Sequence, residues 1–453
     1  MCQNSEPRGN VSSCDTPDLT LNIFLDEGPI AYCCVVPLAA WLLARRNGLR
    51  RSIYAGAVLC FFASVVRSIP ALFSSSFRAT HPALTLLLIH IGQTVNAAVA
   101  PLVVASPAVL SLTWFPVRQR NTATSIANVA NAIGRAVGLY LGPALVRTVT
   151  TVSDVSADST GIKNLLLVNI GVASIPFVCA VSYLPDHPSS PPSAAAMAER
   201  ARLEEEIKRG NSFAKLCADI RQCLCSNNIS LVLLMLSGGL QMAMYGGWSG
   251  VLTSALTSAP TNLSMKDAGL LGTLNTLAGV LGGVLTALLC DTPRFNRSLK
   301  PIMLLLCALS AVCFGAMALA VPNPFNVIMH MPGTADKPIS YPWLLALCTA
   351  AGFFRGGLDP LYFELVAEEA HPIPAGTGGG VLTFFYHALL CVCLTLPPEL
   401  LTRWLLVLMA GCMVLSGLLL ASSQIRYKRS SLAVAEVAKR QQGYPWQGSR
   451  AQV

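Results

Sequence analysis

Four polar side chains lie near the middle of long apolar stretches of this sequence. They are Arg135, Arg355, Asp359 and His387. A charged group at the centre of a bilayer costs about 2.5–3.5 kcal/mol on insertion scales, so such a group usually faces a water-filled cavity or a partner. These residue types can recognise a charged solute and, at the histidine, exchange a proton. We therefore predict that all four line one cavity near the bilayer midplane.

Each of these residues also has a structural interpretation that the sequence leaves open. Arg355 and Asp359 are four residues apart, which lets them neutralise each other as an i,i+4 pair. Arg135 has an alternative in helix packing, and His387 in a hydrogen-bonded place in a helix core. If the histidine does exchange protons, the ordinary imidazole pKa of about 6.5 makes it the pH-sensitive residue of the cavity. Protons are then the coupling ion, that is, the ion whose movement is linked to that of a solute.

Three further residues are predicted to belong to the same cavity. Asn96 shares one helix face with His90 and Gln93. Such a stripe either joins helices or lines a cavity, and we expect lining for Asn96. Asn131 lies one turn before the mid-span arginine of its own stretch. Trp248 follows two glycines, where a helix can unwind and offer an aromatic face to a cationic group.

The composition places these residues in a membrane protein. Hydrophobic residues make up 53% of the 453 residues and charged residues only 12%, which leaves too little polar surface for a soluble protein. Eleven apolar stretches are long enough, or nearly so, to cross about 30 Å of hydrocarbon. The predicted spans are residues 28–44, 52–73, 83–106, 122–146, 163–184, 229–256, 268–290, 301–321, 342–366, 377–397 and 403–422.

Charge alternates between the loops that join these spans. Basic residues concentrate in residues 45–51, 185–228 and 291–300, and positive residues stay on the cytosolic side of membrane proteins. The C-terminus is therefore predicted to lie in the cytosol and, with an odd number of spans, the N-terminus outside. The net charge of +9 follows from this topology, so it indicates attraction to anionic lipid rather than to nucleic acid.

A long polar loop divides the chain into two bundles. We predict a polar segment at 1–27, a first bundle of five spans at 28–184, a cytosolic loop at 185–228, a second bundle of six spans at 229–422 and a cytosolic tail at 423–453. Within the loop, residues 194–209 are predicted to form an amphipathic helix.

Short basic loops near the start of each bundle resemble a signature of the major facilitator superfamily. They read WLLARRNGLR at residues 41–50 and DTPRFNR at residues 291–297, against the superfamily form G-x-L-x-D-R-x-G-R-R. The second loop keeps the acid, Asp291, whereas the first has an arginine in its place. The resemblance implies a gating or structural role for Arg50, Asp291 and Arg294, in an all-α fold of two pseudo-symmetric helix bundles.

The position of this loop also implies which helix comes first. In the superfamily the loop follows the second helix of a bundle, but here it follows the first span of the first bundle. We therefore expect eleven spans, with the usual first helix missing from this sequence. The first span should then pack beside the helix that carries Asn96 and against the second bundle.

Longer motifs narrow the resemblance to one family of solute carriers. These are HIGQTVN at 90–96, TWFPVRQRNTAT at 113–124, GWSGVL at 247–252 and YFELVAEEAHPIPAG at 362–376. They are similar to the carriers related to the feline leukaemia virus subgroup C receptor, above all to the lysosomal branch of that family. The resemblance implies a secondary-active or facilitative transporter of a small organic solute, vitamin-like or choline-like, that works by alternating access. We expect a monomer in the lysosomal membrane, with the plasma membrane as the alternative.

The sequence departs from the family pattern at the mid-span residues. Arg135 and Arg355 stand where family members have small or uncharged residues, and two added cations favour an anionic or zwitterionic solute. His387 stands where the family has a side-chain amide that lines the substrate cavity. Glu364 and Glu368 lie toward the cytosolic end of their span and are expected to make gating contacts with basic loops.

Other classes of function agree less well with the sequence. A membrane enzyme needs a clustered nucleophile and base or a set of metal ligands. The sequence has no CxxC pair and no Cys/His ligand set, so we expect no metal and no cofactor. A non-transporting receptor or scaffold, or an inactive truncated form, stays open because the helix expected to be missing normally contributes to the cavity. The sequon that begins at Asn262 predicts glycosylation on the non-cytosolic side.

Overall fold

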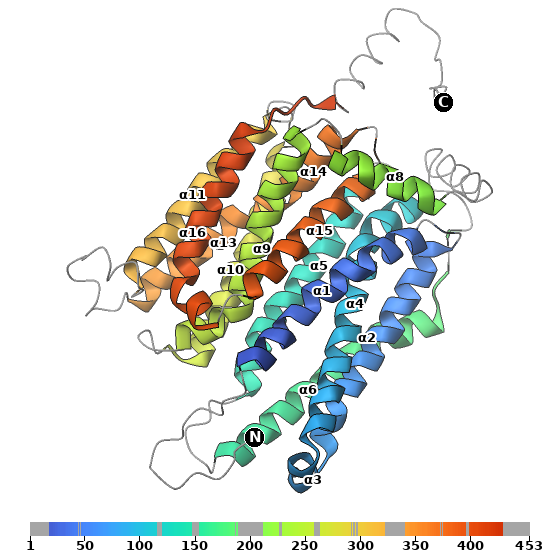
Figure 1. Ribbon diagram of the computed structural model, residues 1–453, viewed down its shortest axis with the longest axis vertical. Coiled ribbons are helices and arrows are strands. Elements are labelled where there is room, and N and C mark those ends of the chain that lie inside the picture. Colours follow the sequence, from blue (N-terminus) through green and yellow to red (C-terminus); the bar gives the residue numbers. More distant parts are fainter. Residues whose placement is uncertain are drawn as a thin grey trace, which may run out of the picture.

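The computed structural model is helical, without strands, throughout the part of the chain that it describes (Figure 1). This part comprises residues 18–43, 45, 47–115, 120–146, 154–185, 187–188, 212–225, 229–257, 263–290, 292, 295, 298–321, 340–371, 373, 375–395 and 398–428.

The described helices form two bundles that lie side by side (Figure 1). The first contains α1 (Asp18–Leu43), α2 (Gly48–Leu72), the short α3 (Ser75–Thr80), α4 (Pro82–Trp114), α5 (Arg120–Leu145) and α6 (Asp154–Ser182). The second contains α9 (Ile229–Thr257), α10 (Met265–Cys290), α11 (Leu299–Ala320), α13 (Tyr341–Gly356), α14 (Leu358–Ala370), α15 (Ala375–Leu394) and α16 (Pro398–Ser422). Between the bundles in sequence lies α8 (Ser212–Cys225).

Eight helices in the described part of the chain are long and apolar enough to cross a membrane. These segments are Gly48–Leu72, Pro82–Pro107, Thr160–Ser182, Ile229–Leu252, Met265–Cys290, Leu299–Leu319, Gly376–Leu394 and Trp404–Ser422. The segment Glu27–Leu43 of α1 is apolar but shorter. The chain is therefore a multi-pass membrane protein, as predicted, while the count of eleven spans stays a prediction.

Helices from opposite bundles are in direct contact mainly at two places, with a smaller contact between α4 and α15. α1 packs against α15, and α5 packs against α10. α1 also packs against α4, so both contacts predicted for the first span are present. On α10, a Cβ atom added at Gly269 would lie only 3.0 Å from Cγ of Pro143, and the Thr273 hydroxyl donates to the Ala136 carbonyl on α5 at 3.3 Å. A small residue on α10 thus lets α5 approach closely.

The helix through the predicted central ion pair is interrupted at Gly357. α13 ends just before this residue and α14 begins just after it. Pro360 has no backbone N–H to bond the carbonyl of Gly356, so the hydrogen-bond ladder is broken here. Arg355 therefore belongs to the last turn of α13 and Asp359 to the first turn of α14. A cation at a helix C-terminus and an anion at an N-terminus are both favoured by the helix dipole.

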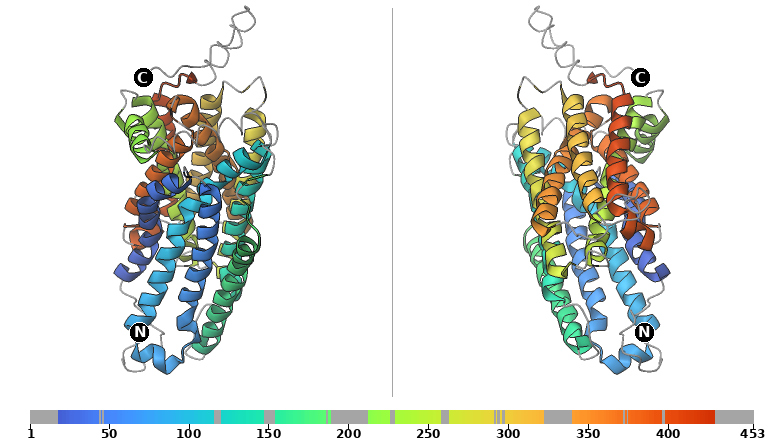
Figure 2. Two further views of the ribbon diagram at one scale, coloured as in Figure 1. Left: turned by 90° about the vertical axis from the view of Figure 1, so that its right-hand side faces the viewer. Right: turned by 90° about the vertical axis from the view of Figure 1, so that its left-hand side faces the viewer.

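Several segments rich in basic residues gather at one end of the molecule. The turn after α1, helix α8 and the end of α16 lie at this end, and α3 lies at the other (Figures 1 and 2). Beyond α16, Nζ of Lys428 contacts the buried carboxylate of Glu369 at the end of α14, at 2.9 Å. The predicted topology requires the basic segments to lie at one end of the molecule, as they do here. Which end faces the cytosol stays a prediction.

Helix α8 was missed by the sequence analysis. It packs against α1, α9 and α15, with Cys223 fully buried. Burial raises the pKa of the Cys223 thiol to about 11, so the thiol stays protonated and packs as an apolar group. Leu216, Ile220 and Cys223 recur three or four residues apart, and this spacing is the signal that could have found the helix. The helix predicted at residues 194–209 lies outside the described residues.

Candidate functional site

A polar cluster lies at the junction between α13 and α14, facing α9. One guanidinium nitrogen of Arg355, Nη2, donates to both carboxylate oxygens of Asp359, at 2.6 and 2.7 Å. Gln241 on α9 completes the cluster: its Nε2 donates to Asp359 at 3.1 Å, and its Oε1 accepts from Nε of Arg355 at 3.3 Å. The geometry therefore agrees with the interpretation that Arg355 and Asp359 neutralise each other.

Arg355 is enclosed, whereas Asp359 is partly open. The side chain of Arg355 is 7% exposed and that of Asp359 is 33% exposed. The ring of Tyr245 covers the guanidinium, with Cζ of Arg355 3.8 Å from the ring centroid, and the Tyr245 hydroxyl donates to Asn275 at 2.8 Å. The accessible charge of this cluster is thus a carboxylate. Of the two interpretations that the sequence left open for Arg355, the geometry favours a neutral pair with Asp359 over an added cation.

Tyr386 on α15 connects this cluster to the first bundle. It lies within electrostatic range of Arg355 and Asp359 and also of Arg135 on α5. A Cβ atom added at Gly246 on α9 would lie 3.1 Å from the Tyr386 hydroxyl oxygen, so this glycine makes room for the phenol group. Arg135 itself is exposed on α5, as is Asn131 one turn earlier. Three of the four predicted mid-span residues therefore act electrostatically on one tyrosine, which the sequence did not single out.

His387 lies in the contact between the bundles. Its ring stacks on Tyr32 of α1, with centroids 3.5 Å apart and an interplanar angle of 9°. Its Nδ1 atom lies 2.8 Å from the carbonyl oxygen of Thr383. A carbonyl can only accept, so Nδ1 carries the proton and donates. The Tyr386 ring is 4.1 Å away, so His387 borders the Tyr386 region while its own face is occupied.

Trp248 does not take part in this site, and the expectation for it was wrong. It is 1% exposed and packs between Tyr245, at 5.5 Å between ring centroids, and Phe314 of α11, at 5.8 Å. The preceding glycines do not unwind the helix, because α9 continues without interruption to Thr257. Their small size serves close packing against α15 instead, so the indole is a core residue of the second bundle.

The polar stripe on α4 joins helices within the first bundle. His90 contacts Glu27 of α1, and Gln93 accepts a hydrogen bond from Arg67 of α2 at 3.0 Å. Asn96 faces α2, where the Cys60 thiol donates to its Oδ1 at 3.8 Å. Asn96 is half-buried, and its lining of the cavity stays a prediction. Glu27 was expected just outside the first span, but it lies inside α1 because the helix begins at Asp18.

The predicted gating residues are partly described. Arg50 is exposed in the first turn of α2, and Glu364 is exposed on α14. Glu368 is 3% exposed near the end of the same helix. Asp291 and Arg294 of the second basic loop lie outside the described residues, as does the sequon residue Asn262. Among the described residues, no group of three metal-ligating side chains comes together.

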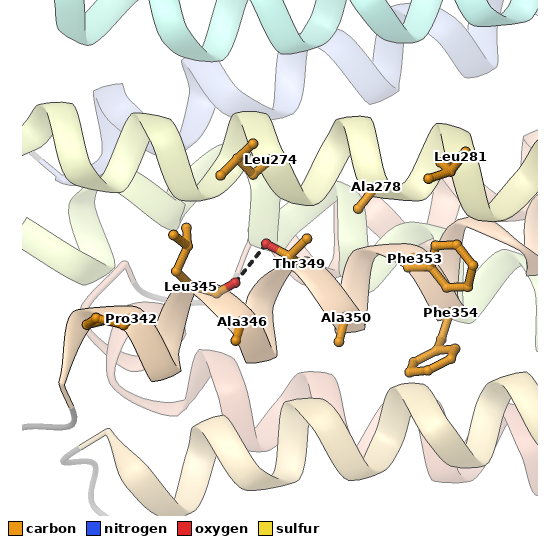
Figure 3. Close-up of a pocket in the computed structure, with 10 residues that line it drawn as sticks. All are labelled: Leu274, Ala278, Leu281, Pro342, Leu345, Ala346, Thr349, Ala350, Phe353 and Phe354. Carbon is orange, nitrogen blue, oxygen red and sulfur yellow. Dashed lines mark hydrogen bonds between the residues drawn. The ribbon is translucent and has the colours of Figure 1, made fainter.

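A separate cavity of about 570 Å³ lies along α10 and α13 (Figure 3). It is lined by Leu274, Ala278, Leu281, Pro342, Leu345, Ala346, Thr349, Ala350, Phe353 and Phe354. The Thr349 hydroxyl donates to the Leu345 carbonyl of its own helix at 2.7 Å, so even this polar group is occupied (Figure 3). None of the predicted site residues lines this apolar cavity.

Comparison with known proteins agrees with this architecture. Residues 28–393 match the Major Facilitator Superfamily. The chain is 30% identical over 420 residues to the Solute carrier family 49 member 4 homolog of Xenopus laevis, covering 90% of this chain and 83% of that protein. It is 23% identical over 356 residues to the Choline/ethanolamine transporter flvcr2b of Danio rerio, covering 78% and 64%. In fold, it is similar to the xylose transporter XylE from E. coli in an inward open conformation, with a TM-score of 0.60, 17% identity and coverage of 91% and 87%.

Two helix bundles and these matches define a membrane transporter. The chain belongs to the Major Facilitator Superfamily and, within it, to solute carrier family 49. The family predicted from the sequence motifs is thereby confirmed.

Proposed function

We propose that this transporter moves a small zwitterionic organic solute by alternating access, with the solute bound between Arg135 on α5 and Asp359 on α14. The observation that carries the proposal is that Tyr386 lies within electrostatic range of both side chains. The two residues belong to opposite bundles, as a central site between the halves of such a transporter needs. The anionic group of the solute pairs with Arg135, and its cationic group pairs with Asp359.

The distribution of charge favours a zwitterion over a simple anion. The charge of Arg355 is balanced by Asp359 and covered by Tyr245. Arg135 of the first bundle is exposed, and Asp359 of the second bundle, although paired with Arg355, keeps 33% of its side chain open to a cationic group. A guanidinium binds carboxylate or phosphate groups in a bidentate manner. Tyr386 adds an aromatic face, which favours an organic ammonium group.

The names of relatives support the cationic end of the solute. The Danio rerio relative is named a choline/ethanolamine transporter, and both of those molecules carry an ammonium group. The extra arginine, Arg135, supports an additional anionic group on the solute of this chain. Because a zwitterion moves no net charge, uphill transport needs a coupling ion, and we propose the proton. The resemblance to the lysosomal branch of the family supports that membrane, with the plasma membrane as the alternative.

Uptake into proteoliposomes tests the charge class directly. Glycine betaine, choline and 3,3-dimethylbutanoate are close in shape but are a zwitterion, a cation and an anion. We expect betaine-type solutes in a panel of metabolites to be taken up or to compete, and Arg135→Gln to abolish this preference. Uptake of cations alone, unchanged by Arg135→Gln, contradicts the proposal. Uptake of anions alone indicates that Arg135 acts without Asp359.

A further inference from the structure

Glu27 and His90 form a partly buried pair between α1 and α4. The Glu27 carboxylate contacts Nδ1 of His90 through Oε1, and the two side chains are 14% and 20% exposed. The second oxygen of the carboxylate, Oε2, is buried and makes no hydrogen bond to any described residue. Leaving one oxygen of an ionised carboxylate without a hydrogen bond inside a protein costs free energy.

We propose that Glu27 and His90 together bind the coupling proton of this transporter. With one proton the pair is neutral overall, whether that proton lies on the imidazole or on the carboxyl group. With no proton the carboxylate is left charged between two helices. Taking up the proton therefore strengthens the α1–α4 contact, and losing it weakens that contact. The proposal rests on the proposed transport function and assigns its proton to a place other than His387.

The charged groups that the neighbouring helices α2 and α3 bring toward this region have other hydrogen-bond partners than Glu27. α2 contributes Arg67, whose guanidinium donates to Gln93, one turn along α4 from His90. α3 contributes Arg78, which donates to the backbone carbonyls of Pro70 and Phe73.

The remaining neighbours lie on three other helices. α5 carries Arg135 in the Tyr386 region, and α15 carries His387 stacked on Tyr32 of α1. α8 carries the charged residues Lys215, Asp219 and Arg221 beside the opposite, cytosolic-side end of α1. No described cation other than His90 is seen to contact the Glu27 carboxylate.

The pair is also connected mechanically to the contact between the bundles. Tyr32 follows Glu27 by five residues on α1, about 7.5 Å along the helix axis. Tyr32 stacks on His387 of α15 in the other bundle. A rocking motion of the bundles that shifts α1 relative to α4 therefore changes the distance between Glu27 and His90. Proton binding and bundle movement are coupled through this one helix.

Transport with an imposed proton gradient tests the proposal. The variants are Glu27→Gln and His90→Gln, compared with His387→Gln and with His81→Gln, whose imidazole is exposed at the end of α3. In wild type and His81→Gln, a gradient should raise uptake several-fold over symmetric pH. Glu27→Gln and His90→Gln should lose this stimulation and keep solute exchange at symmetric pH. Stimulation that survives Glu27→Gln, or that disappears only in His387→Gln, overturns the proposal.

A second measurement does not depend on transport and separates this proposal from the proposed function. The unfolding temperature of the purified chain is measured from roughly pH 5 to 8, a range that covers imidazole titration. The difference between wild type and Glu27→Gln should change with pH, because only the wild type exchanges a proton at this place. A difference that stays constant with pH shows a structural pair only and overturns the proposal, whether or not a zwitterion is transported.

Discussion

Arg355 and Asp359 are joined across the helix junction at Gly357 by two hydrogen bonds from a single guanidinium nitrogen, at 2.6 and 2.7 Å. The two partners are not equivalent, since the arginine is enclosed by Tyr245 and the acid keeps a third of its side-chain surface open. The arginine therefore acts mainly as the counter-charge that holds the carboxylate in place. Losing the arginine and losing both residues should have different consequences.

Arg355→Leu alone is expected to destabilise the protein more than Arg355→Leu combined with Asp359→Asn. Breaking a fully buried ion pair costs about 3–5 kcal/mol, because one charge is left without its partner. Asp359 is 33% exposed and keeps Gln241, so we expect about 2–3 kcal/mol for the single change. Thermal unfolding of the purified variants gives the comparison. A double variant less stable than the single one would show that the carboxylate stabilises the junction of α13 and α14 by itself.

Arg135→Gln is expected to change solute selection more than stability. The side chain is exposed on α5, so its removal breaks no buried contact, but it removes the positive charge that faces Tyr386 from the first bundle. The apparent affinity for a zwitterion should fall about tenfold or more, which corresponds to about 1.4 kcal/mol. The affinity for choline should change little. Arg135→Lys serves as the control, because it keeps the charge and loses the bidentate geometry.

The membrane class, the two bundles and the family follow from the sequence because they depend on local patterns. Apolar runs and alternating loop charge are set by the bilayer itself, and each segment can be recognised without its neighbours. The pairing of Arg355 with Asp359 could also be predicted from the sequence, since an i,i+4 spacing places both on one helix face. For these features, position along a single helix is enough.

The residues on other helices that contact this ion pair could not be predicted from the sequence in this way. Gln241, Tyr245 and Tyr386 are ordinary polar or aromatic residues in apolar stretches, and only the packing of α9 and α15 brings them to the ion pair. Trp248 and Asn96 show the converse case. Both have residue types suited to a cavity, but Trp248 packs in the core of its bundle, and Oδ1 of Asn96 accepts from the Cys60 thiol on α2. Depth in the membrane can be estimated from sequence, whereas the direction that a side chain faces cannot.

Thiol labelling of intact membranes is expected to place α3 and α8 on opposite sides. Positive residues concentrate at the end of the molecule that carries α8, and such residues stay on the cytosolic side. In a background without native cysteines, a single cysteine at Ser76 of α3 should react with an impermeant reagent from outside, in a cell-surface or right-side-out preparation. A single cysteine at Lys215 of α8 should react only after permeabilisation. Equal reactivity of the two positions would contradict the predicted topology.

Gly356→Ala is expected to prevent normal folding because it separates α13 from α10. A Cβ atom added at Gly356 would collide with the backbone of Gly279, and a helix backbone cannot move aside as a flexible side chain can. Overpacking typically costs about 1–3 kcal/mol, and a backbone collision belongs at or above the upper end of that range. The shift would also displace Arg355, which is the neighbouring residue.

Two other glycines provide graded controls for this prediction. A Cβ atom at Gly279 would lie 3.1 Å from the Gly352 carbonyl oxygen, so Gly279→Ala should be milder than Gly356→Ala. Gly315 on α11 has nothing within 4 Å of the added atom, so Gly315→Ala should be neutral or should stabilise the helix by about 0.5–1 kcal/mol. The yield of monodisperse protein in detergent and its unfolding temperature measure all three. If Gly356→Ala matches Gly315→Ala in yield and in unfolding temperature, the close contact between α10 and α13 is not needed to hold the junction of α13 and α14 in place.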